Sequence, residues 1–250
     1  MSTVNALIRY AIAISLLLPM YFCVIAAGLI YKPAGWQIMV SWNRLFLKIF
    51  GVKVNLEYKK PDMDLSSGGV VVGLTQQSIL DAIIGISVAP KMFMSIWNIE
   101  YAIIPFIGWI SWLYGWVIIR QWPGQARKKL KKAEDHIKNG GFVYLSIEGR
   151  RSRDGSLSPF KKGPVVLAIH SQAKIFPFII QGSVNRLPYG KWKIRPGEVT
   201  ARFLEPIATA GMHYEDRDAL VERLHKMAEQ EIEIRSPHGE TGRQKELAYS

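Results

Sequence analysis

The chain has 250 residues, of which 49% are hydrophobic and 21% charged, so it can build a packed core and wholesale disorder is excluded. Its formal net charge of +12 and eight tryptophans favour an anionic partner, such as lipid headgroups at a membrane interface, a phosphorylated substrate or nucleic acid. The one cysteine, Cys23, excludes an intramolecular disulfide.

The first feature along the chain is an almost continuous apolar stretch, AIAISLLLPMYFCVIAAGLI, at residues 11–30. Roughly 20 such residues are enough for a helix to cross the hydrocarbon core of a bilayer. Pro19 lies in the middle, so we consider one kinked transmembrane helix or two short helices that enter and leave one leaflet. A buried core helix or a cleaved signal peptide would also explain the stretch, although it is longer than the usual apolar region of a signal peptide.

Alternating helices and strands follow. Residues 36–50 have apolar side chains at three- and four-residue steps, which predicts an amphipathic helix. Further helices are predicted at residues 79–88, 125–139, 165–171 and 216–234, and strands at residues 52–58, 70–74, 116–119, 142–147, 175–180 and 199–204. This order predicts an α/β fold with a mixed central sheet flanked by helices. We expect an N-terminal membrane-embedded helical segment at residues 1–50, the α/β domain at residues 51–235 and a polar tail at residues 236–250.

Two segments between the strands have both a structural and a lipid-binding interpretation. Residues 102–119 are rich in aromatic and aliphatic side chains, which either pack in the core or lie on a bilayer surface. The helix at residues 125–139 is strongly basic, and its cations are Arg127, Lys128, Lys129, Lys131, Lys132 and Lys138. They form either a solvated face or a surface attracted to anionic headgroups, at roughly 1 kcal/mol per residue.

Two polar motifs each follow a predicted strand. The first is Gln76-Gln77-Ser78-Ile79-Leu80-Asp81, and the second is Glu148-Gly149-Arg150-Arg151-Ser152. Loops at the carboxyl ends of parallel strands often carry the chemistry of an α/β protein. Because an arginine side chain offers a planar fork of donors that fits phosphate oxygens, the second motif predicts a phosphate-binding turn.

The order of these motifs resembles the glycerolipid acyltransferase family, of the 1-acylglycerol-3-phosphate (lysophosphatidic acid) acyltransferase type. The resemblance covers roughly residues 70–204, and its most specific parts are Ser78-x-x-Asp81 and Glu148-Gly149-x-Arg151-Ser152. In the family the first motif is His-x4-Asp. The histidine takes a proton from the acceptor hydroxyl, which attacks a thioester, and the aspartate orients the imidazole.

By this resemblance, Gln76 and Asp81 occupy the catalytic positions. The positions implied to bind substrate are Ser78, Arg120, Glu148, Gly149, Arg150, Arg151, Ser152 and Lys161. Arg150 stands where the family usually has threonine, which adds a charge near the expected phosphate. The resemblance implies no cofactor and no metal. The acyl group comes from a co-substrate, acyl-CoA or acyl carrier protein.

Gln76 departs from the family pattern, since a neutral amide cannot accept a proton at physiological pH. General-base catalysis is worth about 10²–10⁴-fold, so acyl transfer should be impaired. Three explanations are open: a deliberate substitution, a natural relative with little acyl transfer, or another base. The candidates for another base are His136 and His170, both on predicted helices away from Asp81 and expected to have surface or core roles.

We therefore expect a membrane acyltransferase of phospholipid biosynthesis that acylates the free hydroxyl of lysophosphatidic acid to give phosphatidic acid. Its partners would be membrane lipids, lysophosphatidic acid and the acyl donor, and its catalytic domain would face the cytoplasm. A non-catalytic lipid-binding protein of the same fold is the competing hypothesis. A nucleic-acid binder is rejected, because the basic residues are not interleaved with an aromatic stacking platform.

Overall fold

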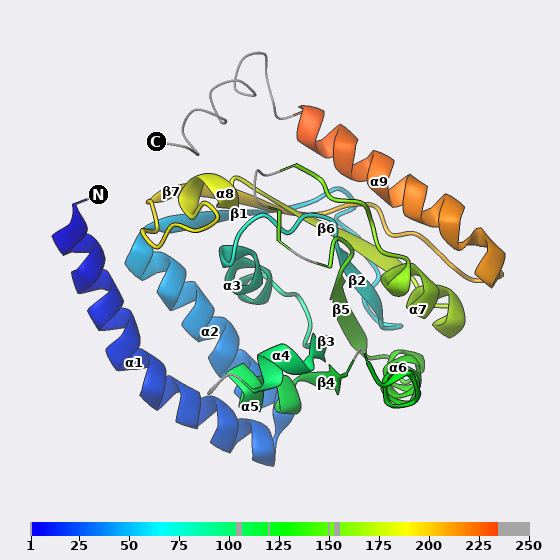
Figure 1. Ribbon diagram of the computed structural model, residues 1–250, viewed down its shortest axis with the longest axis horizontal. Coiled ribbons are helices and arrows are strands. Elements are labelled where there is room, and N and C mark those ends of the chain that lie inside the picture. Colours follow the sequence, from blue (N-terminus) through cyan, green and yellow to red (C-terminus); the bar gives the residue numbers. More distant parts are fainter. Residues whose placement is uncertain (1, 104–106, 120, 150, 153–155, 235–250) are drawn as a thin grey trace.

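The fold is built on a seven-stranded sheet with the strand order β1-β7-β6-β2-β5-β3-β4 (Figure 1). The computed structural model describes residues 2–103, 107–119, 121–149, 151–152 and 156–234. The strands are β1 Val52–Tyr58, β2 Gly69–Gly73, β3 Phe93–Asn98, β4 Gly115–Ile118, β5 Phe142–Ser146, β6 Ile175–Gln181 and β7 Gly197–Phe203. Neighbouring strands run parallel except β6 and β7, which are antiparallel, so the predicted mixed sheet is confirmed.

Helices cover both faces of this sheet and bury two apolar cores. The long helices are α1 Thr3–Ile30, α2 Lys32–Phe50, α3 Leu80–Ser87, α6 Pro123–Lys138, α7 Gly163–Ser171 and α9 Arg217–Ile234. Strand β2 is buried throughout, and its side chains alternate: Val70 and Val72 pack on the core beneath α6, α7 and α9, while Val71 packs on the core beneath α2 and α3. A continuous apolar run is what a strand covered on both faces requires.

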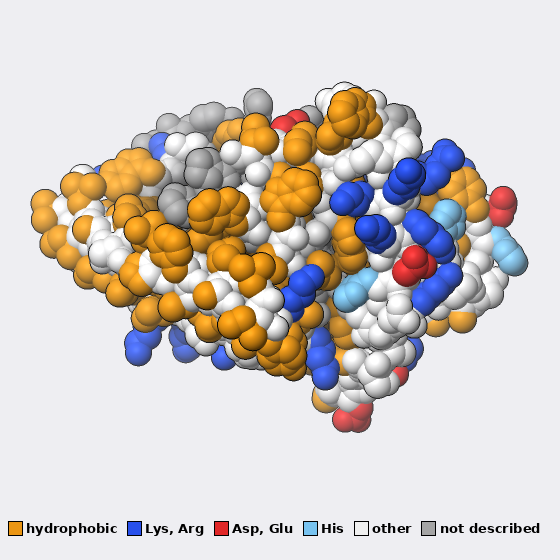
Figure 2. All heavy atoms as spheres, turned by 90° about the horizontal axis from the view of Figure 1, so that it is seen from below, with side chains coloured by type: hydrophobic (Ala, Val, Ile, Leu, Met, Phe, Trp, Pro, Cys, Tyr) orange, Lys and Arg blue, Asp and Glu red, His pale blue; other side chains and the backbone are white. Residues whose placement is uncertain are grey.

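The N-terminal helices form a hairpin along one side of the sheet (Figure 1). Helix α1 continues through Pro19, so the hypothesis of two short helices is wrong. Among the described residues, α1 is the one helix that is long and apolar enough to cross a membrane. Many of its apolar side chains are exposed, and Figure 2 shows them gathered over one part of the surface.

Several elements differ from the sequence-based expectation. Strand β3 was not predicted, because its sequence, FMSIWN, lacks a regular apolar alternation and only one of its residues is buried. The short helices α4 Ile99–Ala102, α5 Ile107–Leu113 and α8 Ser183–Arg186 fill connections between strands. The helix expected at residues 216–234 is confirmed as α9, and a 3₁₀ turn that was not predicted, Tyr214–Asp216, precedes it. The polar tail predicted at residues 236–250 lies outside the described residues.

Candidate active site

The two polar motifs meet at the carboxyl edge of the sheet. Strands β2 and β5 are parallel neighbours, and Gly73 is opposite Ser146 at their last paired positions. The Ile147 N–H then donates to the Gly73 carbonyl at 3.0 Å, which fixes where both strands end. The loops that follow therefore begin side by side, although they are far apart in the sequence.

Glu148 joins these two loops directly. Its side chain is 1% exposed, and its Oε2 accepts a hydrogen bond from the Gln76 backbone N–H. Its Oε1 accepts from the Ser158 N–H at 2.7 Å. Burial raises the pKa of Glu148, while the hydrogen bonds from both N–H groups act in the opposite direction. Because both carboxylate oxygens are engaged by backbone donors, Glu148 braces the motif loops together.

Asp81 lies in the first turn of α3 and is buried. Its Oδ2 accepts from the Gln77 and Ser78 N–H groups at 2.7 and 2.9 Å. Burial raises the pKa of Asp81 to about 6, against the lowering effect of Ser183, these two N–H groups and the charge of Arg151. The Ser183 hydroxyl is near enough to act on this pKa but lacks hydrogen-bond geometry. Among the described residues, Oδ1 has no hydrogen-bond partner.

The Gln76 side chain is held by the end of β5. Its amide Oε1 accepts a hydrogen bond from the Ser146 hydroxyl at 2.9 Å. The backbone carbonyl of Gln76 also accepts from the Ser152 N–H at 2.8 Å, which is a second direct link to the arginine-containing motif. A neutral amide in this position can orient neighbouring groups but cannot remove a proton.

Ser78 has an internal role in the structure. Its hydroxyl donates to the Leu187 carbonyl at 2.8 Å and accepts a longer bond from the Leu80 N–H at 3.3 Å. The side chain is buried, so the predicted substrate-binding role does not follow from this geometry. Instead, Ser78 ties the first motif to the segment after α8.

Arg151 is the described cation that reaches the Asp81 loop. It is exposed, its guanidinium lies 5.4 Å from the centre of the Tyr189 ring, and its charge lowers the pKa of Asp81. Stacking on an aromatic ring orients a guanidinium while leaving its edge donors free for an anion. Arg120 and Arg150, which the sequence also predicted to bind substrate, lie outside the described residues.

Gly149 of the second motif and Lys161, which follows the motif in the sequence, both lie near the end of β5. Gly149 has a φ of 71°, in the left-handed region that favours glycine, and it turns the chain away from β5. The Lys161 N–H donates to the Ile147 carbonyl at 2.7 Å, so its exposed side chain starts from the same edge of the sheet. The next residue, Lys162, pairs with Asp218 of α9 at 2.7 Å.

The two histidines considered as replacement bases lie elsewhere. His136 packs edge-on against Trp116 and lies beside Gly141, which precedes β5 at the amino edge of the sheet. Burial lowers the pKa of His136. His170, near the end of α7, pairs with Glu134 of α6. Neither histidine is at the carboxyl edge, in agreement with the structural roles expected from the sequence.

Sequence reasoning missed four side chains around the motifs: Tyr144, Ser146, Ser183 and Tyr189. Burial raises the pKa of Tyr144, and the charge of Asp81 acts in the same direction, so the two groups are close. Ser146 and Ser183 could have been found, because they lie at the ends of β5 and β6, both parallel to β2. Tyr189 lies in an irregular segment that has no comparable signal.

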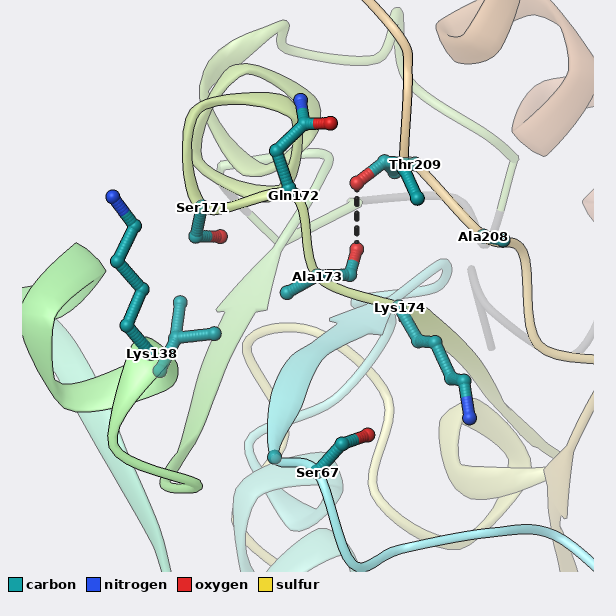
Figure 3. A pocket seen from close by; sticks show the side chains of 11 residues that line it. Ser67, Lys138, Ser171, Gln172, Ala173, Lys174, Ala208 and Thr209 are labelled. Atoms are coloured by element: carbon teal, nitrogen blue, oxygen red, sulfur yellow. Dashed lines mark hydrogen bonds between the residues drawn. The ribbon is translucent and has the colours of Figure 1, made fainter.

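Two cavities lie away from these motifs. One of about 350 Å³ opens at the opposite, amino edge of the sheet (Figure 3). Several of its polar side chains bond to the protein itself, as Thr209 does to the Ala173 carbonyl at 2.8 Å. A second cleft, of about 580 Å³, lies between α2 and β1. Within the described residues, no group of histidine, cysteine or acidic side chains could hold a metal ion.

The carboxyl edge of the sheet thus brings together a buried aspartate, a glutamate brace and an arginine, all from the two motifs on which the resemblance to acyltransferases rests. Residues 52–181, more than half of the chain, match the family described as Acyltransferase. The chain therefore belongs to the acyltransferase family, as the sequence predicted.

Several relatives carry the name 1-acyl-sn-glycerol-3-phosphate acyltransferase. The protein of Limnanthes douglasii is 31% identical over 66% of this chain and 60% of its own length. The human beta form is 29% identical, over 77% of this chain and 67% of its own length. The Haemophilus influenzae protein is 25% identical, over 80% of this chain and 83% of its own length. The chain thus spans about 60% of the plant relative.

The fold is also seen in a solved structure. The crystal structure of the 1-acyl-sn-glycerophosphate (LPA) acyltransferase PlsC from Thermotoga maritima superposes with a TM-score of 0.69. The alignment covers 92% of this chain and 99% of that chain, at 22% sequence identity. At this identity the likeness supports the fold, including the expected mixed sheet with helices on both faces.

Proposed function

We propose that this chain is a membrane-attached 1-acylglycerol-3-phosphate acyltransferase whose chemical step is slowed by Gln76. The acceptor would be lysophosphatidic acid, the donor acyl-CoA or acyl carrier protein, and the product phosphatidic acid. One observation carries the proposal: Gln76 and Asp81 share a loop that is hydrogen-bonded to the arginine-containing motif, with Arg151 acting electrostatically on Asp81. The names of the relatives supply the substrate class.

In the proposed reaction, the free hydroxyl oxygen of the lysolipid forms a bond to the thioester carbonyl carbon. The carbon–sulfur bond breaks, and the hydroxyl proton ends on the departing thiol. Arg151 would hold the lysolipid phosphate, and Lys161 would add a second positive charge near it. With an amide at residue 76, binding and orientation remain, but the proton leaves without a general base.

Asp81 supports the assignment of residue 76 as the position of the base. Its Oδ2 is held by two backbone N–H groups, whereas its buried Oδ1 has no hydrogen-bond partner among the described residues. A buried acceptor without a donor is unfavourable by about 1–3 kcal/mol. A ring N–H from histidine at residue 76 would supply such a donor and would fix the tautomer that accepts the hydroxyl proton.

The decisive experiment compares Gln76→His with the parent chain in detergent or nanodiscs. Acyl transfer from acyl-CoA and from acyl carrier protein to lysophosphatidate would be measured for both. We expect Gln76→His to be faster by about 10²-fold or more. Gln76→Asn, which changes the side chain without adding a base, is the control and should show no gain.

A non-catalytic lipid-binding protein is the second candidate, favoured by the hydrogen bond that holds the Gln76 amide on Ser146. It predicts that lysophosphatidate binds to both forms while Gln76→His stays inert. If a folded Gln76→His protein neither binds lysophosphatidate nor transfers an acyl group to it, both candidates are wrong.

The same proposal includes attachment to a membrane through α1, with the catalytic domain on the cytoplasmic side. Its support is the length of α1 and its exposed apolar side chains, together with the family to which the chain belongs. Flotation of the protein with phosphatidylcholine vesicles tests the attachment, and protease accessibility in sealed membranes tests the side.

A further inference from the structure

The surface of α5 and α6 combines exposed indole rings with lysines. In α5, Trp109 and Trp112 are 54% and 60% exposed, and Trp122, immediately before α6, is 62% exposed. The Lys129 Nζ lies 6.0 Å from the centre of the Trp112 ring, which places the two helices' side chains in one patch. We call this patch the Trp–Lys surface, and it consists of Trp109, Trp112, Trp122, Lys128, Lys129 and Lys132.

The lysines of this surface have few negative neighbours. On α6, ion pairs involve Lys131, whose amino group lies 3.5 Å from Glu134 and 3.3 Å from Asp135. In the described part of the chain, no carboxylate pairs with Lys128, Lys129 or Lys132. The spacing of these three lysines places them on one side of the helix, which is the side that contacts Trp112.

The two acidic residues of α6 face different directions. Asp135 is exposed on the same side as Lys128 and Lys132, and it pairs with Lys131 at 3.3 Å. Glu134 turns toward α7, where one of its oxygens lies 3.4 Å from His170 Nδ1. The side of α6 continuous with α5 therefore keeps a net positive charge, because Lys128, Lys129 and Lys132 lie there beside one carboxylate that is already paired with Lys131. Lysines that have no carboxylate partner among the described residues and lie beside exposed tryptophans match an interface between anionic groups and an apolar phase.

The Trp–Lys surface is also continuous with α1. The Tyr21 ring of α1 lies 6.1 Å from the Trp109 ring of α5. Figure 2 shows apolar side chains of α1 and α5 and the basic side chains of α6 on the same side of the molecule. A bilayer that receives the apolar side of α1 would thus meet the indoles at headgroup depth and the lysines at the charged surface.

We propose that the Trp–Lys surface docks on the anionic headgroups of a phospholipid leaflet. Docking makes the protein selective for negatively charged membranes, a property that α1 alone does not supply because its exposed side is apolar. The inference rests on the proposed membrane attachment but not on acyl transfer. An acidic carrier protein would be attracted by the same lysines, but three indoles exposed by more than half fit a lipid surface better.

Chemical footprinting of lysines tests this docking in the full chain. The protein is placed in nanodiscs of phosphatidylcholine, with or without phosphatidylglycerol, and lysines are acetylated with a water-soluble reagent. We expect phosphatidylglycerol to slow acetylation of Lys128, Lys129 and Lys132 about 5-fold, which is the effect of roughly 1 kcal/mol per lysine. Lys60 and Lys226, exposed on other parts of the molecule, are internal controls and should not change.

A charge-matched pair of variants gives an independent readout. The triple variant Lys128→Gln, Lys129→Gln, Lys132→Gln should bind phosphatidylglycerol vesicles with an initial rate about 10-fold lower than the parent, because charge accelerates association. The variant Lys60→Gln, Arg223→Gln, Lys226→Gln removes the same charge elsewhere and should stay near the parent rate. Phosphatidylcholine vesicles should not distinguish the three proteins.

Three outcomes would overturn the inference. The first is acetylation of Lys128, Lys129 and Lys132 at the same rate in both kinds of nanodisc. The second is an equal loss of vesicle-binding rate in the two triple variants. The third is protection of the lysines by acidic acyl carrier protein but not by phosphatidylglycerol, which would assign the surface to the donor protein. Loss of binding to phosphatidylcholine would instead show that attachment through α1 is wrong, so the two failures are distinguishable.

Discussion

The backbone N–H of Gln76 donates a hydrogen bond to the carboxylate of Glu148, a residue 72 positions further along the chain. The second oxygen of the same carboxylate holds the Ser158 N–H. One buried side chain thus fixes three segments at the carboxyl edge of the sheet. The bond orders the loop that carries both Gln76 and Asp81, so the integrity of the site depends on Glu148.

Glu148→Ala should therefore destabilise the protein and loosen the site. It would leave two backbone N–H groups without their acceptor, at about 1–3 kcal/mol each. Thermal unfolding in detergent should show a lower midpoint, and binding of lysophosphatidate should weaken. Glu148→Gln keeps one acceptor oxygen and should lose less than the alanine variant. An unchanged midpoint for Glu148→Ala would contradict the bracing role.

Gly73→Ala should disturb the site by displacing the Tyr144 side chain. A Cβ at residue 73 would lie 2.5 Å from the Tyr144 hydroxyl, so the phenol would have to move. Because Tyr144 is electrostatically coupled to Asp81, we expect a lower melting temperature together with a changed pKa of Asp81. Overpacking of this kind costs about 1–3 kcal/mol.

Gly85→Ala is the matched control for this substitution. Its Cβ would be in ordinary contact with Phe178 at 3.8 Å, and alanine is favoured over glycine within α3 by about 1 kcal/mol. We expect Gly85→Ala to raise the melting temperature. Equal destabilisation by both substitutions would show that the Tyr144 contact is not the cause.

Asp81 should make stability depend on pH in a defined direction. Burial raises its pKa from 3.8 to about 6, so the folded protein binds this proton more tightly than the unfolded chain does. Its contribution to stability is therefore present below about pH 4 and is lost as the pH rises to about 6. Asp81→Asn removes this loss, which amounts to about 3 kcal/mol at neutral pH.

Thermal unfolding of the parent and Asp81→Asn at a series of pH values measures the effect. The advantage of the asparagine variant should be largest above pH 6 and should shrink as the pH falls toward 4. An advantage that does not change with pH would mean that Asp81 has an ordinary pKa in the folded protein.

Arg151→Lys should show whether the lysolipid phosphate is recognised by the geometry of the guanidinium or only by its positive charge. Lysine keeps the charge but loses the planar fork and the stacking on Tyr189. We expect affinity for lysophosphatidate to fall about 10-fold, the effect of losing a charge-assisted hydrogen bond, while affinity for monoacylglycerol stays unchanged. Arg217, which stacks on Tyr214 at 4.0 Å, provides the control variant Arg217→Lys. Equal losses for both lipids would argue against a phosphate contact.

Patterns in the sequence predicted most of the fold because its strongest signals are local. The apolar run around Val71 marked a strand covered on both faces, and β1 was predicted with the bounds that the structure has. The order of the two motifs and their places after strands identified the family. For residues 11–30 the sequence left open one helix kinked at Pro19 or two short helices, and the structure has one continuous helix, α1.

Local sequence patterns could not predict contacts between segments that are far apart in the chain. Sequence assigned Ser78 to the substrate, whereas the structure turns its hydroxyl toward the Leu187 carbonyl. The hydrogen bond between Ser146 and Gln76 arises only when β2 and β5 pair in their observed register. Strand β3 was missed because its place in the sheet is set by β4 and β5 on either side, not by its own apolar alternation.

The pairing of β1 with β7 has a consequence for how the molecule is made. Among the described strands, β1 is the first along the chain, and it pairs at the edge of the sheet with β7, the last, with Val52 opposite Gly197. During synthesis, β1 therefore emerges long before its partner and has no sheet to join until Phe203 follows. If α1 enters a bilayer as proposed, the nascent chain is tethered to the membrane before β7, the partner of β1, has been synthesised.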